Sequence, residues 1–256
     1  IEASLQEVLR DVRIAVADFD PMREQAREAI AELKASRPEQ VGTADHEEAI
    51  AFLEWLLHDN FTFLGYDEFV VQEADGHQRL DRVDESKLGV FRLEQPRYQE
   101  RIRTDQGVEG DRYVLVPQLL SFAKSAYHAR IHRPTYPDYI SVDRYDDQGR
   151  VIGERRFLGL FTATVYNESP RNVPILRRKL ATVMDNSGFN PKGHNGKHLL
   201  HILEVYPRDD LFQIDTDELT QTALGILDMR ERRRVRLFIR EDRSGKFYSC
   251  LAFVPR

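Results

Sequence analysis

The sequence predicts an α+β fold, in which a mostly antiparallel sheet lies between two groups of helices and a hairpin closes the chain. Three observations lead to this class. Apolar residues recur at helical spacing in the first quarter and again towards the end, and the middle carries extended segments rich in aromatic and β-branched residues. The last residues alternate between apolar and charged side chains. No internal repeat or low-complexity linker interrupts this layout.

Three helices are expected in the first quarter of the chain. The first covers residues 4–18. Asp20 caps the second, with Pro21 in the first helical position, and this helix ends before Pro38. The third begins near Asp45, because Asp45 and Glu48 have the spacing of a capping box ahead of an apolar stripe.

The predicted strands follow. Residues 61–72 (FTFLGYDEFVVQ) are rich in aromatic and β-branched residues, which favours a strand. A polar stretch then interrupts, and only residues 88–91 within it look extended. Further extended segments are expected at residues 113–116, 119–133, 139–145 and 156–166. A turn containing Gly149 joins the last two, and bulky side chains on both faces of the last one predict a central strand.

Three more helices and the hairpin complete the prediction. The helices cover residues 174–186 and 196–206 and a segment that begins at a second capping box, formed by Asp215 and Glu218. In the hairpin, at residues 233–255, apolar side chains alternate with arginines. One face of this ribbon should therefore be buried and the other solvated.

Composition and charge exclude several classes of protein. Hydrophobic residues make up 41% of the chain, which is enough for a packed core and excludes a wholly disordered polypeptide. The formal net charge of -6 opposes binding to nucleic acid. No apolar run approaches the roughly 18–20 residues of a membrane span. The single cysteine, Cys250, cannot form an intrachain disulfide or a cysteine zinc cluster. With no visible signal peptide, we expect a cytoplasmic protein.

The charges are unevenly distributed. Acidic residues outnumber basic ones over residues 1–60, and the reverse holds over residues 165–256. The basic region leaves room for an anionic partner, such as the acidic region of a second copy. The chain begins at Ile1 and ends at Arg256, directly after a strand-like run, so we expect a piece of a longer polypeptide.

Phosphate binding has one weak candidate, at residues 188–197 (GFNPKGHNGK). Gly188 and Gly193 have the separation of a P-loop, but His194 stands where the lysine is required. No G-x-G-x-x-G occurs anywhere. We interpret this segment as a loop between two helices, with Gly188 placed to end the first of them.

A metal site has a second candidate. His194, His198 and His201 lie on one side of a predicted helix, roughly opposite its apolar stripe. Two imidazoles one turn apart can chelate zinc, but no H-E-x-x-H motif and no neighbouring cysteine supports them. A metal site and a solvent-facing or interface role both remain open. His128 and His132 share the spacing, but in a strand-like context where it loses its meaning.

No complete catalytic set emerges. There is no G-x-S-x-G motif, and Cys250 is interpreted as a small core or interface residue in an alternating strand rather than as a nucleophile. Asp146–Asp147 and Asp209–Asp210 lie in turn-like sequence and are interpreted as solvated turn residues. We therefore expect no catalytic, cofactor-binding or metal-binding residue, and predict a ligand-sensing or assembly module.

Two clusters of basic residues indicate anion recognition. They comprise Arg171, Arg177, Arg178 and Lys179 on one predicted helix, and Arg230, Arg232, Arg233, Arg234 and Arg236 at the start of the hairpin. Strand alternation would place Arg232, Arg234 and Arg236 on a single face. A docking surface for an acidic helix is the favoured interpretation; a small carboxylate or phosphate effector and plain solvation are the alternatives.

A set of aromatic residues on the strands suggests a sensor function. Its members are Phe63, Tyr66, Phe69, Tyr139 and Phe161. Beside charged neighbours, they could enclose a small effector such as an amino acid or a nucleotide. If they enclose nothing, the scaffold interpretation remains.

Five long strings resemble the large bacterial NAD-specific glutamate dehydrogenases, in the N-terminal half of that family. Three of them are DNFTFLGYDEF at residues 59–69, GFNPKGHNGKHLLHILEVYPRDDLFQI at 188–214 and RRRVRLFIREDRSGKFYSC at 232–250. The other two lie at residues 119–142 and 156–179. Together they extend the resemblance over the whole chain.

This resemblance implies a parent enzyme that oxidatively deaminates L-glutamate to 2-oxoglutarate and ammonia with NAD, and that forms homo-oligomers. The dehydrogenase core of the family lies in its C-terminal half, and the matched strings are not catalytic motifs. The resemblance therefore implies a non-catalytic regulatory or assembly segment that is inactive alone and binds no cofactor itself. Its expected partners are other copies, the rest of the parent chain and a small-molecule effector, but not nucleic acid or membrane.

The family's N-terminal half holds ACT-like domains and a PAS-like domain. The resemblance accordingly implies N-terminal helices at residues 1–44, a PAS-like α+β domain at 45–230 and the first hairpin of a truncated ACT-like domain at 231–256. The free edge of that hairpin is expected to pair with another strand.

Overall fold

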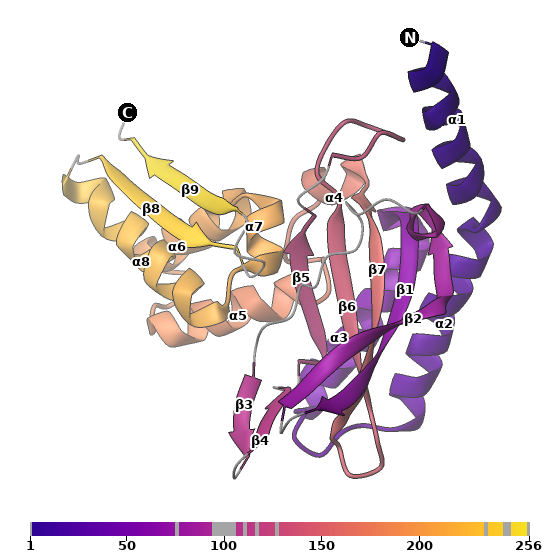
Figure 1. The fold of residues 1–256 in the computed structure, drawn as a ribbon. Helices are drawn as coiled ribbons and strands as arrows, with labels where there is room; N and C mark the ends of the chain where they lie inside the picture. Colours follow the sequence, from indigo (N-terminus) through magenta and orange to yellow (C-terminus); the bar gives the residue numbers. More distant parts are fainter. Residues whose placement is uncertain are drawn as a thin grey trace. The chain divides into compact units, whose positions relative to one another are not determined.

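A computed structural model describes residues 2–74, 77–93, 106–109, 112–115, 118–125, 128–232, 235–242 and 247–254. The α+β class is confirmed, with N-terminal helices, an antiparallel sheet, further helices and a two-stranded hairpin following one another along the chain (Figure 1). By packing, the chain divides into two compact units, Ile1–Thr162 and Ala163–Arg256. This division differs from the boundaries implied at 44/45 and 230/231, which stay a prediction.

The first unit begins with the three expected helices, α1 (Glu2–Ala17), α2 (Phe19–Ala35) and α3 (Thr43–Trp55), the last continued by a π-helical turn, η1 (Leu56–Asn60). The predicted cap of α2 at Asp20 is wrong by two residues, because Asp18 occupies the N-cap position and the helix begins at Phe19. The predicted cap of α3 is also wrong, because Gly42 occupies the N-cap position and Asp45 lies inside the first turn. A carboxylate there is still favoured by the helix dipole.

Five strands form the antiparallel part of the sheet, in the order β2-β1-β7-β6-β5. They are β1 (Phe61–Ala74), β2 (His77–Gly89), β5 (Leu120–Lys124), β6 (Asp138–Tyr145) and β7 (Val151–Phe161). The short strands β3 (Gln106–Glu109) and β4 (Arg112–Leu115) extend the sheet beyond β2, with β4 parallel to it. The predicted central strand is confirmed, because β7 lies between β1 and β6 and is buried along nearly its whole length.

Strand β2 was not expected from the sequence. Only residues 88–91 looked extended, whereas β2 runs from His77 to Gly89 and a 3-10 turn, η2 (Val90–Arg92), follows it. Leu80 is the one side chain described in β2 that is buried. The strand is held by its backbone pairing with β1. Because this pairing does not depend on apolar side chains, the sequence of β2 shows no alternating apolar pattern that would predict a strand.

The end of the sheet differs from the expected strand at 156–166. Strand β7 begins earlier, at Val151, and ends at Phe161, where α4 (Ala163–Asn167) follows after one residue. The predicted turn between β6 and β7 is confirmed, with Gly149 at φ 74°, a conformation that glycine adopts readily.

Side-chain alternation in β7 builds two cores. Phe157 and Phe161 lie on one face, where Phe161 meets Trp55 of α3 at a ring-centroid distance of 6.3 Å. Leu158 and Leu160 lie on the other face, in a cluster with residues of α1, η2 and the segment after β5. Helices and loops thus cover both faces of the central strand.

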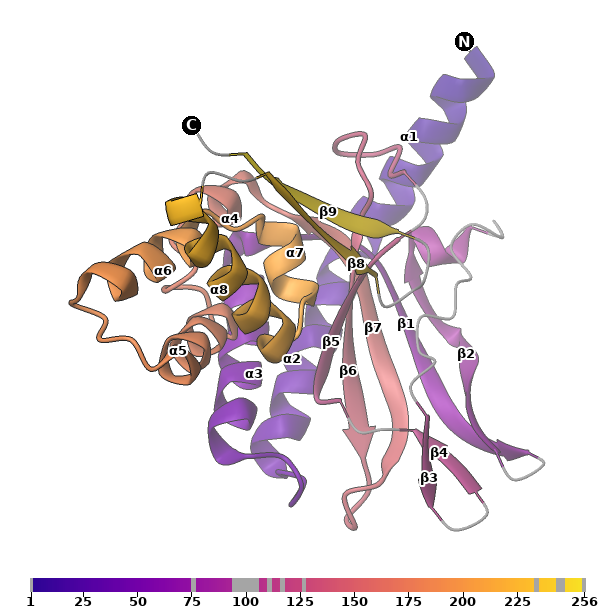
Figure 2. The ribbon, with the colours of Figure 1, turned by 90° about the vertical axis from the view of Figure 1, so that its left-hand side faces the viewer.

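The second unit is a group of helices followed by the hairpin (Figure 2). Its elements after α4 are α5 (Leu176–Ser187), α6 (His194–Val205), α7 (Arg208–Gln213), α8 (Thr216–Arg232), β8 (Arg236–Glu241) and β9 (Tyr248–Phe253). Two predicted helix signals are confirmed. Gly188 ends α5 in the left-handed conformation, and the Asp215 carboxylate accepts a hydrogen bond from the Glu218 backbone N–H at 2.7 Å before α8. Helix α7 was not expected.

The hairpin buries the face opposite to the one predicted. Leu237 and Ile239 are 54% and 59% exposed, whereas Phe238 and Arg240 are half-buried. Helix α8 explains the reversal, because the Phe238 ring packs against this helix, 3.2 Å from the position that a Cβ atom at Gly225 would take. The apolar face of this ribbon is therefore uncovered in the described part of the chain.

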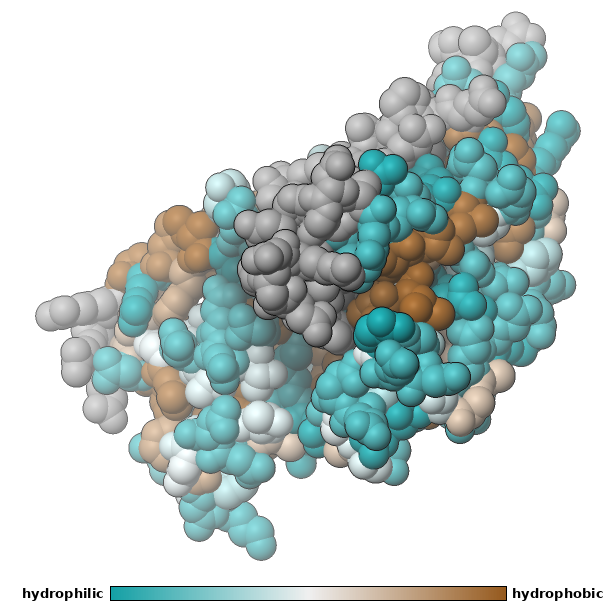
Figure 3. Space-filling model, turned by 60° about the horizontal axis from the view of Figure 1, so that its bottom comes forward, coloured by the Kyte–Doolittle hydropathy of each residue, from teal (hydrophilic) through white to brown (hydrophobic). Residues whose placement is uncertain are grey.

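Among the helices that the structure describes, none has the length and apolarity needed to cross a membrane. On the face shown in Figure 3, hydrophilic side chains cover most of the surface and hydrophobic ones gather in separate patches.

Candidate functional site

The predicted aromatic set is buried. Its five members are at most 5% exposed and belong to the packed interior of the first unit: Phe63, Tyr66, Phe69, Tyr139 and Phe161. Rings in this region pack edge to face at centroid distances near 5–6 Å, as for Phe61 with Phe161 at 5.2 Å. The structure does not support the prediction that these side chains enclose an effector, because Phe63 and Tyr66 pack against Phe157 and Phe161 packs against Phe61.

A charged cluster is buried among these rings. Arg156 of β7 donates two hydrogen bonds to Asp67 of β1, at 3.0 and 2.8 Å, and Arg82 of β2 approaches the same carboxylate at 3.0 Å. The exposed fraction is 1% for the Arg156 side chain and 0% for that of Asp67. The Arg156 guanidinium also lies 4.4 Å from the centroid of the Phe69 ring and 5.0 Å from that of Tyr139.

The electrostatics of this cluster explain how two arginines can be held in the interior. Burial alone would lower the pKa of Arg156, but the negative charge and the hydrogen bonds of Asp67 outweigh burial and raise that pKa above its ordinary value. For the less buried Arg82, burial prevails over the attraction of Asp67, and its pKa is lowered. The cluster ties three strands together and is structural in character.

A second polar group lies on the opposite face of β7, because Arg155 and Arg156 are adjacent in the strand. Arg155 donates a hydrogen bond to Glu32 of α2 at 2.8 Å and approaches Glu68 of β1 at 3.7 Å. Arg144 of β6 lies 3.6 Å from each of these two carboxylates. The Tyr66 hydroxyl donates to Glu68 at 2.5 Å, and burial, aided by this carboxylate, raises the pKa of Tyr66.

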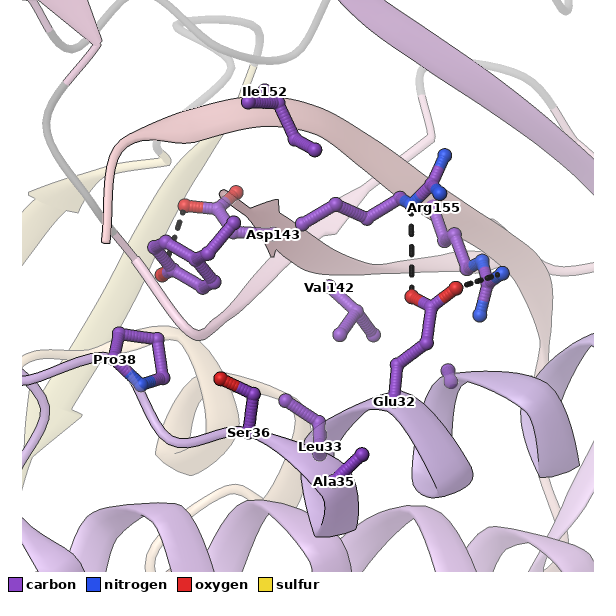
Figure 4. A pocket seen from close by; sticks show the side chains of 12 residues that line it. Glu32, Leu33, Ala35, Ser36, Pro38, Val142, Asp143, Ile152 and Arg155 are labelled. Atoms are coloured by element: carbon purple, nitrogen blue, oxygen red, sulfur yellow. Dashed lines mark hydrogen bonds and ion pairs between the residues drawn. The ribbon is translucent and has the colours of Figure 1, made fainter. Parts of the chain in front are cut away.

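This second group borders a pocket of about 310 Å³ between α2 and strands β6 and β7 (Figure 4). Its lining is Ala29, Glu32, Leu33, Ala35, Ser36, Pro38, Val142, Asp143, Arg144, Tyr145, Ile152 and Arg155. In Figure 4, Glu32 projects from the helix towards Arg155, with Leu33 and Val142 beside it. Sequence analysis missed this site, although one signal was present: two adjacent arginines begin the apolar string RRFLGLF.

The three predicted histidines lie on one helix, α6. The rings of His194 and His198 approach within 3.1 Å between their Nε2 atoms, while His194 and His201 are exposed. Over the described ranges, no group of three His, Cys, Asp or Glu side chains is placed to hold a metal ion. The histidines face outward, opposite Leu199 and Leu203, as the apolar stripe indicated.

The basic clusters are only partly a surface. Lys179 donates hydrogen bonds to three backbone carbonyls at the end of α7, those of Leu211, Phe212 and Ile214, and so links α5 to α7 instead of facing a partner. Arg232 closes α8, so the expected strand alternation of Arg232 with Arg236 is wrong. The side chains of Arg230 and Arg232, and all of Arg233 and Arg234, lie outside the described residues.

The paired carboxylates have different fates. Asp146 and Asp147 lie in the turn before β7, as predicted. The prediction of a solvated turn at Asp209–Asp210 is wrong, because both residues are in α7 and Asp210 is only 9% exposed. It accepts a hydrogen bond from Arg240 of β8 at 3.1 Å, which fastens the hairpin to this helix.

Cys250 lies in β9 and is exposed, on the same face of the hairpin as Leu237 and Ile239. The predicted alternatives for this residue were a small core residue or an interface residue, and its exposure excludes the core within the described chain.

Comparison with known proteins shows which family this chain resembles. Residues 173–232, which include α5 to α8, match the family model described as glutamate dehydrogenase, helical motif 1. The whole chain is 80% identical to part of the NAD-specific glutamate dehydrogenase of Halomonas elongata and 48% identical to part of that of Pseudomonas aeruginosa. The resemblance to NAD-specific glutamate dehydrogenases is confirmed.

The chain aligns with one segment of each of these relatives. It spans 16% of the length of each of these two relatives, and at 29% identity it covers 15% of the NAD-specific glutamate dehydrogenase of Mycobacterium tuberculosis. The residues that match the helical-motif model lie in the second unit, whereas the pocket of Figure 4 lies in the first.

Proposed function

We propose that this chain is a non-catalytic regulatory and assembly segment of an NAD-dependent glutamate dehydrogenase, whose parent converts L-glutamate, NAD and water to 2-oxoglutarate, ammonia and NADH. One observation carries the proposal. The whole chain aligns with a stretch that makes up 16% of the length of relatives named NAD-specific glutamate dehydrogenase. It nevertheless contains no G-x-G-x-x-G fingerprint for the dinucleotide. NAD binding and hydride transfer then belong to other parts of the parent.

The architecture supports a division of the chain into domain types. An antiparallel sheet with helices on both faces is consistent with a PAS-like domain, and the two-stranded hairpin with the opening of an ACT-like domain. We keep both assignments as part of the proposal.

The hairpin supports the assembly role. Its uncovered face is made of Leu237 and Ile239 and of their cross-strand partners Ala252 and Cys250, with Tyr248 near the end of the ribbon. An exposed apolar face next to free strand edges favours association with another chain or segment. The expected partners are other copies and the rest of the parent chain.

Two experiments test the proposal. The isolated chain should neither bind NAD nor produce NADH from glutamate, and glutamate-dependent NADH formation by it would refute the non-catalytic role. In the full-length enzyme, a Leu237→Lys, Ile239→Lys double variant should shift the oligomer towards smaller species in sedimentation, because it charges the uncovered face. Val205→Lys, at a 65% exposed position of α6, is the matched control and should leave the oligomer unchanged. An unaltered oligomer in the double variant would remove the assembly role.

A further inference from the structure

The pocket between α2 and strands β6 and β7 has a wall of unused hydrogen-bond donors. Arg155 is 4% exposed, and within the described parts of the chain its Nε and Nη1 groups have no hydrogen-bond acceptor. The buried Nε group of Arg144, on the neighbouring strand, is in the same condition. Leaving such groups unsatisfied costs free energy, which a ligand oxygen bound between the two arginines would recover.

The opposite wall, on helix α2, is acidic. Glu32 lies in the pocket lining and Glu28 lies one turn before it, at 2.8 and 3.6 Å from the Arg155 Nη2 atom. The side chains of these two glutamates are 47% and 48% exposed, so their carboxylates remain accessible to a ligand that enters from solvent. The strand side is mixed, because Asp143 of β6 also lines the pocket and Glu68 of β1 lies within 3.7 Å of both arginines. The pocket therefore presents charges of both signs close together, with its arginines on the strands and Glu32 on the helix.

This arrangement selects for charge of both signs on one small molecule. A simple anion would gain the arginines but face the glutamates, and a simple cation would have the reverse difficulty. A molecule with a carboxylate and an ammonium group close together satisfies both walls. Leu33, Val142 and Ile152 add apolar surface to the lining, against which a short hydrocarbon group can pack.

We propose that this pocket binds a small zwitterion of the amino-acid type, with its carboxylate on Arg155 and Arg144 and its ammonium group on Glu32. The inference deepens the proposed regulatory function by naming a ligand class and a site, and it rests on that function only for its biological meaning.

Three probes of similar size separate the two charges. L-alanine carries both groups, propionate lacks the ammonium group, and ethylamine lacks the carboxylate. Binding to the 256-residue chain is measured by NMR or calorimetric titration at constant ionic strength. L-alanine should bind at least about tenfold more tightly than propionate, and ethylamine should bind weakest. Equal affinity for all three probes, or no binding of L-alanine at 100-fold excess over the highest protein concentration, would overturn the proposal.

Two matched variants locate the site. Ile152 is 42% exposed at the pocket edge, so Ile152→Trp should fill the pocket without disturbing the core and weaken L-alanine binding about tenfold or more. Val205→Trp makes the same type of change at an exposed position outside the lining and should leave binding unaltered. Arg155→Lys, checked for folding by circular dichroism, keeps the positive charge but lacks the fork and should also weaken binding. Unchanged affinity in both pocket variants would place the ligand elsewhere.

These titrations do not involve NAD or turnover. Their failure would leave the proposed dehydrogenase segment intact, and NADH production by the isolated chain would overturn that proposal without affecting the binding result.

Discussion

The substitution Asp67→Asn tests whether the buried charged cluster stabilises the first unit. Asparagine keeps the size of the side chain but removes the charge that compensates Arg156, which is 1% exposed and donates two hydrogen bonds to the Asp67 carboxylate. Removing one partner of a buried ion pair costs about 3–5 kcal/mol, because the other charge is left without compensation in the interior. With a urea m-value of roughly 2 kcal/mol/M, the unfolding midpoint should fall by about 1.5–2.5 M.

The single tryptophan, Trp55, reports this transition. It lies at the end of α3 against Phe161, so its fluorescence follows unfolding of the unit that contains Asp67. Glu24→Gln is the control, since it removes a carboxylate from an exposed pair with Arg27 at 2.6 Å and should change stability by no more than about 0.5 kcal/mol.

Adding Arg156→Met to Asp67→Asn should restore part of the lost stability, because it removes the more deeply buried of the two arginine charges that Asp67 compensates. The reasoning is refuted if the free energy of unfolding of Asp67→Asn lies within about 1 kcal/mol of that of the wild type. It is also refuted if the second substitution lowers the free energy of unfolding further.

Three further predictions concern other parts of the chain. Arg240→Ala should release the hairpin from Asp210, a partly buried ion pair, and hydrogen exchange of the β8 amides should become faster while exchange in α5 stays unchanged. Burial raises the pKa of Glu218 in the folded state, so between its unfolded and folded pKa the unfolded chain binds fewer protons and stability falls as the pH rises. Glu218→Gln should abolish this component, and a thermal-unfolding series from acid to neutral pH that shows the same decline in both proteins would contradict it. Gly89→Ala should lower the melting temperature more than Gly188→Ala: both have φ above 60°, but a methyl group at Gly89 would overlap the Leu64 carbonyl, whereas nothing lies within 4 Å at Gly188. Equal losses in the two variants would show that the backbone conformation alone sets the cost.

Local sequence signals predicted the elements whose boundaries are set by local chemistry. Gly188 ends α5 because it adopts a left-handed conformation without penalty, and Asp215 caps α8 through a bond to a residue three positions away. Both signals lie within a few residues of what they determine. The central position of β7 was also predicted, because bulky apolar residues occupy both of its faces.

The missed elements depend on partners far along the chain. Strand β2 is polar and forms by pairing with β1, and α7 is held by the amine of Lys179, which lies more than thirty residues before its last carbonyl partner. The reversed burial of the hairpin has the same origin, because Phe238 and Arg240 find their neighbours on α8 and α7. No pattern within these segments contains that information.

The same distinction applies to the candidate site. The residues alone predicted most of the helices and the central strand. They also showed the absence of a dinucleotide fingerprint and, through long matching strings, the relation to glutamate dehydrogenases. The pocket was decided by tertiary structure, since it unites Glu32 of a helix with Arg144 and Arg155 of two strands more than a hundred positions away. Periodicity and spacing report neighbours within one element, whereas a binding site depends on charges that only the packing of several elements brings within a few ångströms.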